Sequence, residues 1–293
     1  MKPPKFEFVR ADSVKGAIAA LSEYGEGARI LAGGQSLVPM MNLRIARPTH
    51  LIDITRIPGL DRVEEHSDGV VIGAAARHYA VEGSDVVKRV CPLVPEALKL
   101  VAHETIRHRG TVCGSLAHAD PHSELPAVAV ALDAVITIAG PLGERHVPAS
   151  EFYFGPFMTA VGPSEMVTAV KFPAIPSSAG YAIAEFARTH GNFAIAGAVS
   201  IIELDADGSV RRAALSLFGL ASRPLRASMA EQALLGKVPT AEVIERAAAA
   251  ALEGVECSED MHGSAAYRTN IGRVYAARVI GTAVARANAG ERQ

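Results

Sequence analysis

The hydrophobic pattern of the first 55 residues alternates between the period of a strand and the period of a helix. Short apolar runs predict strands at residues 6–9, 29–31 and 49–54. Between the first two, apolar residues recur at helical spacing, with Asp12 or Ser13 as the cap and Gly25 as the stop. A short helix interrupted at Pro39 is expected over 37–43. The order is β-α-β-α-β, a unit too small to bury both of its faces alone.

The same mixture of periods continues to a proline- and serine-rich segment at 173–178, the best linker candidate in the chain. Apolar runs predict strands at 70–74, 134–139, 144–147 and 166–172. Helices are expected over 84–101, broken at Pro92 and Pro95, and over 125–132. The pattern therefore predicts a first domain over 1–177, with subdomains of about 1–57 and 58–177.

Beyond the linker, three strands are followed by helices only. The strands are expected at 181–188, 194–204 and 210–220, and a tight turn at 205–208 makes a hairpin of the last two. The helices are expected at 226–235, 240–252 and 265–289. We therefore predict an α+β protein whose second domain, 178–293, is a three-stranded sheet plus a helical bundle.

Composition excludes several classes of protein. The 293 residues are 49% hydrophobic, which is enough for a large core and more than one domain. A net charge of −2 without a basic tract argues against nucleic acid as a partner. No apolar run could span a membrane and no signal segment opens the chain, so a cytoplasmic protein is expected. Three scattered cysteines, without a C-x-x-C pair, argue against a disulfide framework or a bound metal cluster.

Two glycine turns are the strongest candidates for a binding site. The first is Ala32-Gly33-Gly34-Gln35-Ser36-Leu37, and the second is Arg109-Gly110-Thr111-Val112-Cys113-Gly114-Ser115-Leu116. Glycine allows positive φ and close approach of a ligand, and successive N–H groups in such a turn bind an anion. Ser36 is placed to cap the following helix. For the first motif alone an ordinary strand-to-helix turn is the favoured explanation, but the second motif repeats the pattern and changes the balance. We predict that both turns close on one phosphate-bearing cofactor.

Other polar clusters leave alternatives open. His118, Asp120, His122 and Glu124 would share one face of an extended segment, but Pro121 breaks it, so a hydrogen-bonding loop is favoured over a metal site. Residues 107–109 are either a solvated charged stretch or cationic support for a pyrophosphate or a partner subunit. Residues 188–193 form either a plain turn or one that projects an aromatic ring toward the cofactor. No Rossmann, P-loop, zincin or nucleophile-elbow motif occurs.

Taken together, the motifs resemble the medium, FAD-binding subunit of the molybdenum hydroxylases, the family of xanthine dehydrogenase, aerobic carbon monoxide dehydrogenase and the bacterial N-heterocycle hydroxylases. The resemblance covers essentially the whole chain. It is carried by the two glycine turns, by Tyr181…Phe186-Ala187-Arg188…Gly191-Asn192-Phe193-Ala194 and by His262-Gly263-Ser264…Tyr267-Arg268. The segment 101–120 looks most like the quinoline-type enzymes.

The resemblance implies a two-part FAD domain of the vanillyl-alcohol-oxidase (PCMH) type, followed by the C-terminal domain of the carbon monoxide dehydrogenase flavoprotein. It implies FAD as the cofactor, with Glu124 near its sugar-like chain and Phe193 near the isoalloxazine. The implied FAD-binding residues are Ala32, Gly33, Gly34, Gln35, Ser36, Leu37, Thr111, Val112, Cys113, Gly114, Ser115, His118, Glu124 and Phe193. No catalytic side chain and no metal ligand is implied on this chain.

The resemblance also implies partners and a role. A large molybdopterin-binding subunit and a small subunit with two [2Fe–2S] clusters would complete a heterotrimer, paired into a dimer of heterotrimers. Electrons would pass from the clusters through FAD to an external acceptor while a small, N-heterocyclic substrate is hydroxylated at molybdenum.

Three departures and three alternatives accompany this interpretation. Cys113 stands where the family usually has Gly, so either it adopts negative φ or FAD binding is weakened. Glu185 lies where some relatives have Lys, and Asn192 replaces a frequent Asp. The alternatives are a stand-alone FAD oxidase or dehydrogenase, the medium subunit of a carbon monoxide dehydrogenase, and a non-enzymatic nucleotide-binding scaffold.

Overall fold

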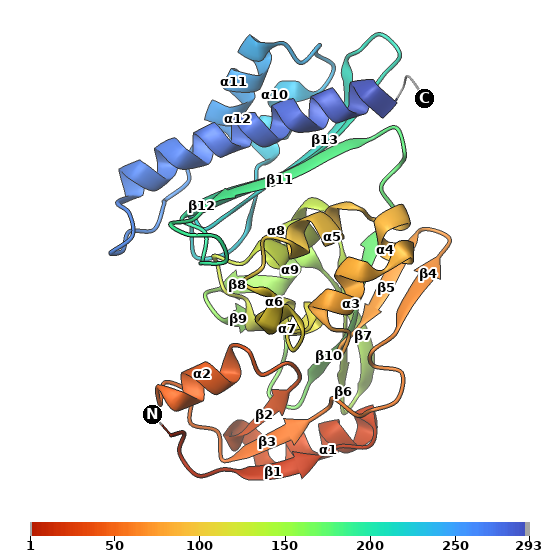
Figure 1. Ribbon diagram of the computed structural model, residues 1–293, viewed down its shortest axis with the longest axis vertical. Coiled ribbons are helices and arrows are strands. Elements are labelled where there is room, and N and C mark those ends of the chain that lie inside the picture. The colour runs from red at the N-terminus through yellow and green to blue at the C-terminus, as the bar shows by residue number, and fades with distance from the viewer. Residues whose placement is uncertain (1, 291–293) are drawn as a thin grey trace.

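The computed structural model describes residues 2–290, which form three parts stacked along the long axis of the molecule (Figure 1). The N-terminal part is a parallel sheet of order β1-β3-β2, made of β1 (Glu7–Arg10), β3 (His50–Asp53) and β2 (Ala28–Leu31). Helix α1 (Val14–Tyr24) begins where Ser13 accepts a hydrogen bond from the Gly16 N–H and ends at Gly25, as predicted. A short 3-10 turn, η1 (Gly25–Gly27), leads into β2.

The central part is an antiparallel sheet of order β4-β5-β10-β6-β7. Its strands are β4 (Val63–His66), β5 (Gly69–Gly73), β10 (Met166–Pro173), β6 (Val135–Gly140) and β7 (Gly143–Pro148). Its helices are α3 (His78–Gly83), α4 (Asp85–Val90), α5 (Leu93–Leu98), α6 (Glu104–Arg107), α7 (Val112–His118), α8 (Glu124–Ala131) and α9 (Ala149–Phe152). A small hairpin, β8 (Tyr153–Gly155) with β9 (Met158–Thr159), projects beside them.

The C-terminal part is an antiparallel sheet of order β11-β12-β13-β14, covered by helices. The strands are β11 (Gly180–Phe186), β12 (Ala196–Leu204), β13 (Val210–Phe218) and β14 (Leu225–Arg226). The helices are α10 (Ser228–Leu234), α11 (Ala241–Ala250) and α12 (Ala265–Gly290), and α12 crosses β11 and β12 (Figure 1). The predicted count of three strands was wrong by one, because two-residue β14 is too short to show a period.

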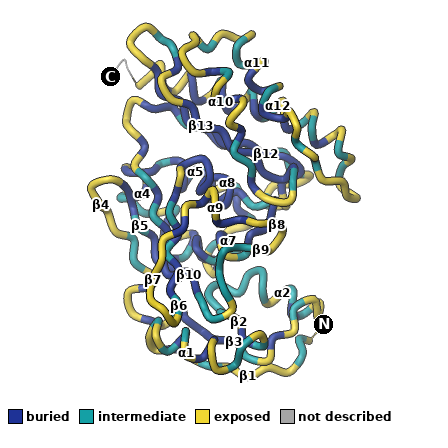
Figure 2. Tube along the Cα trace, turned by 180° about the vertical axis from the view of Figure 1, so that it is seen from behind, coloured by how far each residue is buried: buried dark blue, intermediate teal, exposed yellow. Residues whose placement is uncertain are grey.

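The C-terminal sheet is buried on both faces. Alternate residues of β12 join two different cores: Val199 and Ile201 pack with the central part, while Ala198 and Ile202 pack under α12. All nine residues of β12 and all eight of α8 are buried (Figure 2). Helix α8 contacts both β12 and β13, so it joins the central part to the C-terminal sheet.

Within residues 2–290, no helix combines the length and the apolar character needed to cross a membrane.

Candidate functional site

The two glycine turns touch each other through their backbones. A Cβ added to Gly33 would lie 2.6 Å from the Arg109 carbonyl oxygen and 2.7 Å from the Gly110 Cα. Only glycine fits at such a contact. Gly33 does not have positive φ, whereas Gly34 does, at 73°. The positive φ expected in this turn is therefore found at Gly34. At Gly33, glycine is required by the close approach of the second turn.

The first turn presents a row of main-chain donors. It follows β2 and precedes α2 (Leu37–Asn42). Among the residues that the structure describes, the N–H groups of Gly33, Gly34, Gln35 and Ser36 donate no hydrogen bond to the protein. The Gln35 side chain folds back, and its Nε2 donates to the Gly33 carbonyl oxygen at 3.0 Å. Four successive free N–H groups in one turn match the donor set that binds an anion.

The second turn is the start of a capped helix. The Thr111 hydroxyl accepts from the Gly114 N–H at 3.1 Å, and a Cβ on Gly114 would lie 2.5 Å from that hydroxyl oxygen. The His78 N–H donates to the Gly110 carbonyl oxygen at 2.9 Å, and the Arg77 guanidinium donates to that of Arg109. These contacts attach the second turn to the start of α3.

A cleft of about 490 Å³ opens beside the contact between the turns. It is lined by Phe8, Leu31, Ala32, Gly33, Gly34, Gln35, Val38, Pro39, Asn42, Asp53, Thr55 and Arg109. Asp53 is buried, and one of its oxygens accepts from the Thr55 N–H at 2.9 Å. The lining combines backbone donors, amides and one carboxylate with apolar walls, which is the composition of a site for a polar organic ligand.

Two local expectations were wrong. Ser36 occupies the cap position of α2, but its side chain makes no capping hydrogen bond. Pro39 does not interrupt α2, because it lies in the first turn of the helix. A backbone nitrogen there has no intrahelical acceptor, so a proline breaks no hydrogen bond.

Cys113 follows the first of its two alternatives. It lies in α7 at negative φ, is only 2% exposed, and its thiol donates to the Ile72 carbonyl oxygen at 3.5 Å. Burial raises the pKa of this thiol to about 12. The side chain therefore belongs to the core, and only the main chain of Cys113 can reach a ligand.

Residues 119–123 form the predicted hydrogen-bonding loop, while His118 ends α7 and Glu124 begins α8. Asp120 accepts from the His122 N–H at 2.9 Å, and the His122 Nδ1 lies 2.8 Å from the Ala194 carbonyl oxygen. The His118 ring lies 5.0 Å from the Phe157 ring. Across residues 2–290, no group of three or more His, Cys, Asp or Glu side chains is arranged to hold a metal ion.

A buried carboxyl group, that of Glu124, and a part-buried one, that of Glu185, lie near this loop. Burial, with a smaller contribution from the neighbouring Asp120, raises the pKa of Glu124 to about 7. Burial also raises the pKa of Glu185 to about 8, with a contribution from Glu124. One Glu185 oxygen is buried without a hydrogen-bond partner in the described part of the chain. At neutral pH Glu185 is therefore mostly protonated and Glu124 is protonated about half of the time, so either carboxyl can act as a hydrogen-bond donor in its protonated form.

The remaining candidates separate into structural and exposed residues. Arg107 forms an ion pair with Glu82 at 3.0 Å and donates to the Val101 carbonyl oxygen at 3.1 Å, so it holds α6 and is not a solvated charge. Arg109 lines the cleft. Phe193 lies in the loop between β11 and β12 and is 70% exposed.

The sequence did not lead us to select Gly110 as a site residue, although it stands in the quoted motif, and it left Arg109 open between a solvated charge and cationic support for a pyrophosphate. The presence of glycine at position 110 could have identified it. A Cβ at this position would lie 3.0 Å from the His78 ring, so the site favours glycine. Asn42, Asp53 and Thr55 were also missed, because only the fold brings them to the first turn.

Comparisons with known proteins agree with the fold. A family model described as the FAD binding domain in molybdopterin dehydrogenase matches residues 4–175, and the CO dehydrogenase flavoprotein C-terminal domain matches 181–283. The chain is 41% identical to the 6-hydroxypseudooxynicotine dehydrogenase complex subunit alpha of Paenarthrobacter nicotinovorans, over 98% of this chain and 97% of that one. These matches confirm the predicted two-part FAD domain and the C-terminal flavoprotein domain.

Two solved structures superpose on nearly the whole chain. Carbon monoxide dehydrogenase from Hydrogenophaga pseudoflava gives a TM-score of 0.95 at 40% identity and covers 98% of this chain and 99% of that one. Quinoline 2-oxidoreductase from Pseudomonas putida 86 gives a TM-score of 0.94 at 32% identity with the same coverage. The chain therefore belongs to the family of FAD-binding subunits of the molybdopterin dehydrogenases and is an oxidoreductase subunit.

Proposed function

We propose that this chain is the FAD-carrying medium subunit of a heterotrimeric molybdenum hydroxylase, and that its two glycine turns bind the diphosphate of FAD. The observation that carries the proposal is the contact of Gly33 with Arg109 and Gly110, which brings the free N–H groups of the first turn beside the second. A large molybdopterin-binding subunit and a small [2Fe–2S] subunit would complete the heterotrimer, and two heterotrimers would form a dimer.

The residues of the site fit a dinucleotide. The N–H groups from Gly33 to Ser36 and those of Thr111 and Cys113, which donate to no described residue, supply donors for diphosphate oxygens. Glu124, whose pKa burial raises to about 7, offers a donor to the sugar-like chain in its protonated form. Phe193 offers an exposed ring to cover the isoalloxazine. When bound, FAD supplies electron transfer between the clusters of a partner and an external acceptor.

The division of labour follows from these groups. This chain binds the cofactor, orients it and shields one face of its ring system, while substrate chemistry belongs to the partner that carries molybdenum. A stand-alone oxidase would need a general base beside the flavin with access to substrate. Glu185 is the carboxyl group considered for this role, but it is part-buried and its pKa of about 8 leaves it mostly protonated at neutral pH. The subunit role therefore has the stronger support.

We propose an N-heterocyclic substrate for the complex. The support is the similarity to quinoline 2-oxidoreductase and to a dehydrogenase subunit whose named substrate, 6-hydroxypseudooxynicotine, is a nitrogen heterocycle. A carbon monoxide dehydrogenase is the second candidate, supported by the TM-score of 0.95. Turnover of the reconstituted complex with carbon monoxide and with a panel of N-heterocycles separates the two.

We also propose residue 177 as the boundary between the two domains. The family matches end at 175 and resume at 181, and residues 174–179 contain no helix or strand.

Purification tests the function. The chain, expressed with its two partner subunits, is expected to be yellow, to release FAD on denaturation, and to reduce a dye only when all three subunits are present. Substrate-dependent dye reduction by the purified chain alone would support the stand-alone oxidase. A colourless complex that turns over substrate would overturn the proposal.

A further inference from the structure

Helix α8 is attached to the C-terminal sheet at both of its ends. At the N-terminal end, the His122 Nδ1 lies 2.8 Å from the Ala194 carbonyl oxygen, and the Gly219 N–H donates to that of Pro121 at 2.8 Å. At the C-terminal end, the Arg226 guanidinium donates to the Val130 carbonyl oxygen at 2.9 Å. The helix between these two attachments is completely buried.

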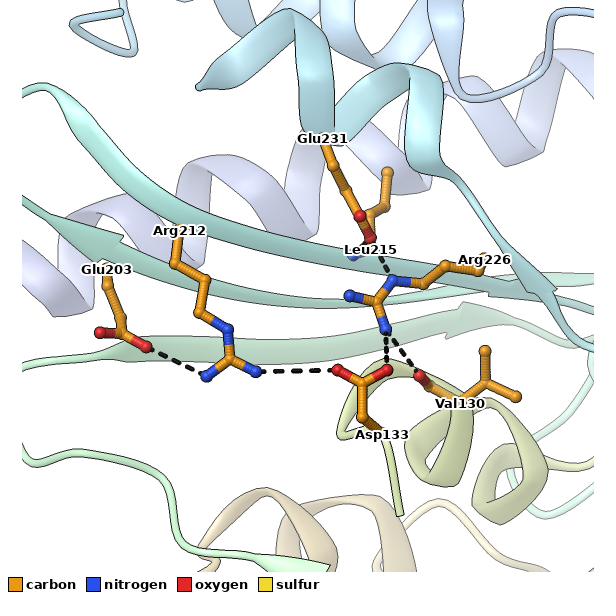
Figure 3. Close-up of polar contacts among 7 residues, drawn as sticks. All are labelled: Val130, Asp133, Glu203, Arg212, Leu215, Arg226 and Glu231. Atoms are coloured by element: carbon orange, nitrogen blue, oxygen red, sulfur yellow. Dashed lines mark hydrogen bonds and ion pairs between the residues drawn. The ribbon is translucent and has the colours of Figure 1, made fainter. Parts of the chain in front are cut away.

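Arg226 is the centre of the C-terminal attachment (Figure 3). Its guanidinium donates to Asp133 at 2.8 Å as well as to Val130, and it forms an ion pair with Glu231 of α10. The same Glu231 oxygen accepts from the Leu215 N–H of β13 at 2.8 Å. One planar side chain thus links α8, β14 and α10. A lysine could not make these contacts together, because it lacks the fixed fork of donors.

The contact with Val130 has a clear electrostatic benefit. The last carbonyl groups of a helix lack intrahelical partners and carry partial negative charge, which a cation stabilises. Asp133, just beyond the helix, has φ of 53°, a conformation that is uncommon for a residue with a side chain. Its carboxylate is held by Arg226 and also lies 3.8 Å from Arg212, which in turn binds Glu203 at 3.2 Å (Figure 3).

The N-terminal attachment leads directly to Phe193. Ala194, held by His122, follows it in the chain. The next carbonyl, that of Ile195, accepts from the buried Arg268 at 2.6 Å. The loop before Phe193 is largely exposed, although Gly191 within it lies close to His103, where an added Cβ would be 2.7 Å from the ring. The residues that follow Phe193 are buried and held by these hydrogen bonds.

We infer that Arg226 is a positioning residue for the cofactor site: by holding the far end of α8 to the C-terminal sheet, it sets where the Phe193 loop and Glu124 stand relative to the two glycine turns. That the ligand of this site is FAD rests on the proposed function. The coupling between Arg226 and Phe193 is a property of the chain itself and does not depend on the ligand. Energetic coupling between two distant residues, here Arg226 and Phe193, is carried by rigid elements with defined contacts at both ends. The buried helix α8 is such an element.

The absence of tryptophan from the chain provides a specific probe. In a Phe193→Trp background, the single indole reports the loop through quenching by acrylamide in the apoprotein and through quenching by bound FAD. Arg226→Met is expected to change the acrylamide quenching constant of this indole and to weaken FAD binding about threefold to tenfold. Circular dichroism verifies that the fold is retained. Arg226→Lys is expected to recover only part of the effect.

Arg273→Met is the matched control, because Arg273 forms an exposed ion pair with Glu245 at 3.4 Å between α12 and α11, away from α8. It is expected to leave both readouts unchanged. If Arg226→Met does not fold, Asp133→Asn removes the exposed partner of the same attachment and should shift the readouts in the same direction.

The outcomes separate the two proposals. Failure of the unsubstituted chain, alone and with its partner subunits, to bind FAD would contradict the proposed function, while the indole quenching of the parent Phe193→Trp apoprotein would still measure the coupling. Normal FAD binding by the parent, with identical indole quenching in the parent, Arg226→Met and Asp133→Asn proteins, would overturn the role of Arg226.

Discussion

The contact between the glycine turns predicts a strong effect from the smallest possible substitution. In Gly33→Ala, the new Cβ would lie 2.6 Å from the Arg109 carbonyl oxygen and 2.7 Å from the Gly110 Cα, whereas ordinary contacts begin at 3.4 Å. Both neighbours are backbone atoms and cannot rotate away, so the turns must separate by several tenths of an ångström. Overpacking of this kind costs about 1–3 kcal/mol. The donors of the two turns then no longer converge on one ligand.

If that cost falls on the bound state, the Kd for FAD rises about 5- to 150-fold, since each 1.4 kcal/mol is a factor of about ten. The assay is a titration of the apoprotein with FAD, followed by flavin fluorescence, together with a thermal unfolding curve. Gly83→Ala is the matched control, because a Cβ there meets no atom within 4 Å. A Kd and Tm for Gly33→Ala equal to those of the control would refute the reasoning.

Three further predictions concern the buried thiols and carboxyl groups. Cys113→Gly should bind FAD as the parent does, but its free energy of unfolding in a urea titration should fall by about 1–3 kcal/mol, because the substitution removes a buried side chain from a helix. A large loss of flavin at unchanged stability would contradict this. In the native protein a thiol reagent at pH 8 should modify only the half-buried Cys257, because burial raises the pKa of Cys91 and of Cys113 to about 12. Modification of more than one thiol per chain before unfolding would be the contrary result. Because the folded-state pKa values of Glu124 and Glu185 are raised to about 7 and about 8, the stability of the apoprotein should fall as pH rises from 5 to 8, and Glu185→Gln should flatten that slope and raise Tm at pH 8. A steeper slope in the variant would be inconsistent with a protonated Glu185.

The sequence predicted those elements that have a clear hydrophobic period or that begin and end at cap, glycine or turn residues. Ser13 and Gly25 bound α1 because a hydroxyl cap and a glycine stop act within one helical turn. The turn between β12 and β13 was identified for the same reason, with Gly208 at φ of 80°. Strand β4 was missed because its sequence, Val-Glu-Glu-His, is polar and exposed, and it becomes a strand only by pairing with β5.

The site shows the same division between local and long-range information. Gly34 could be identified as a positive-φ position from its motif alone. The need for glycine at Gly33 comes from residues 76 and 77 positions away, and no local pattern contains that information. The burial of Cys113 in a helix likewise depends on its contact with the Ile72 carbonyl in another element. Pairing between distant segments is what the structure adds to the motifs.

The most direct test of the central claim is a crystal structure of the chain loaded with FAD in its complex. The account predicts diphosphate oxygens within hydrogen-bond distance of the main-chain N–H groups of Gly33 to Ser36 on one side and of Thr111 and Cys113 on the other. A diphosphate bound away from these turns, or held by side chains with the N–H groups of both turns facing water, would contradict it.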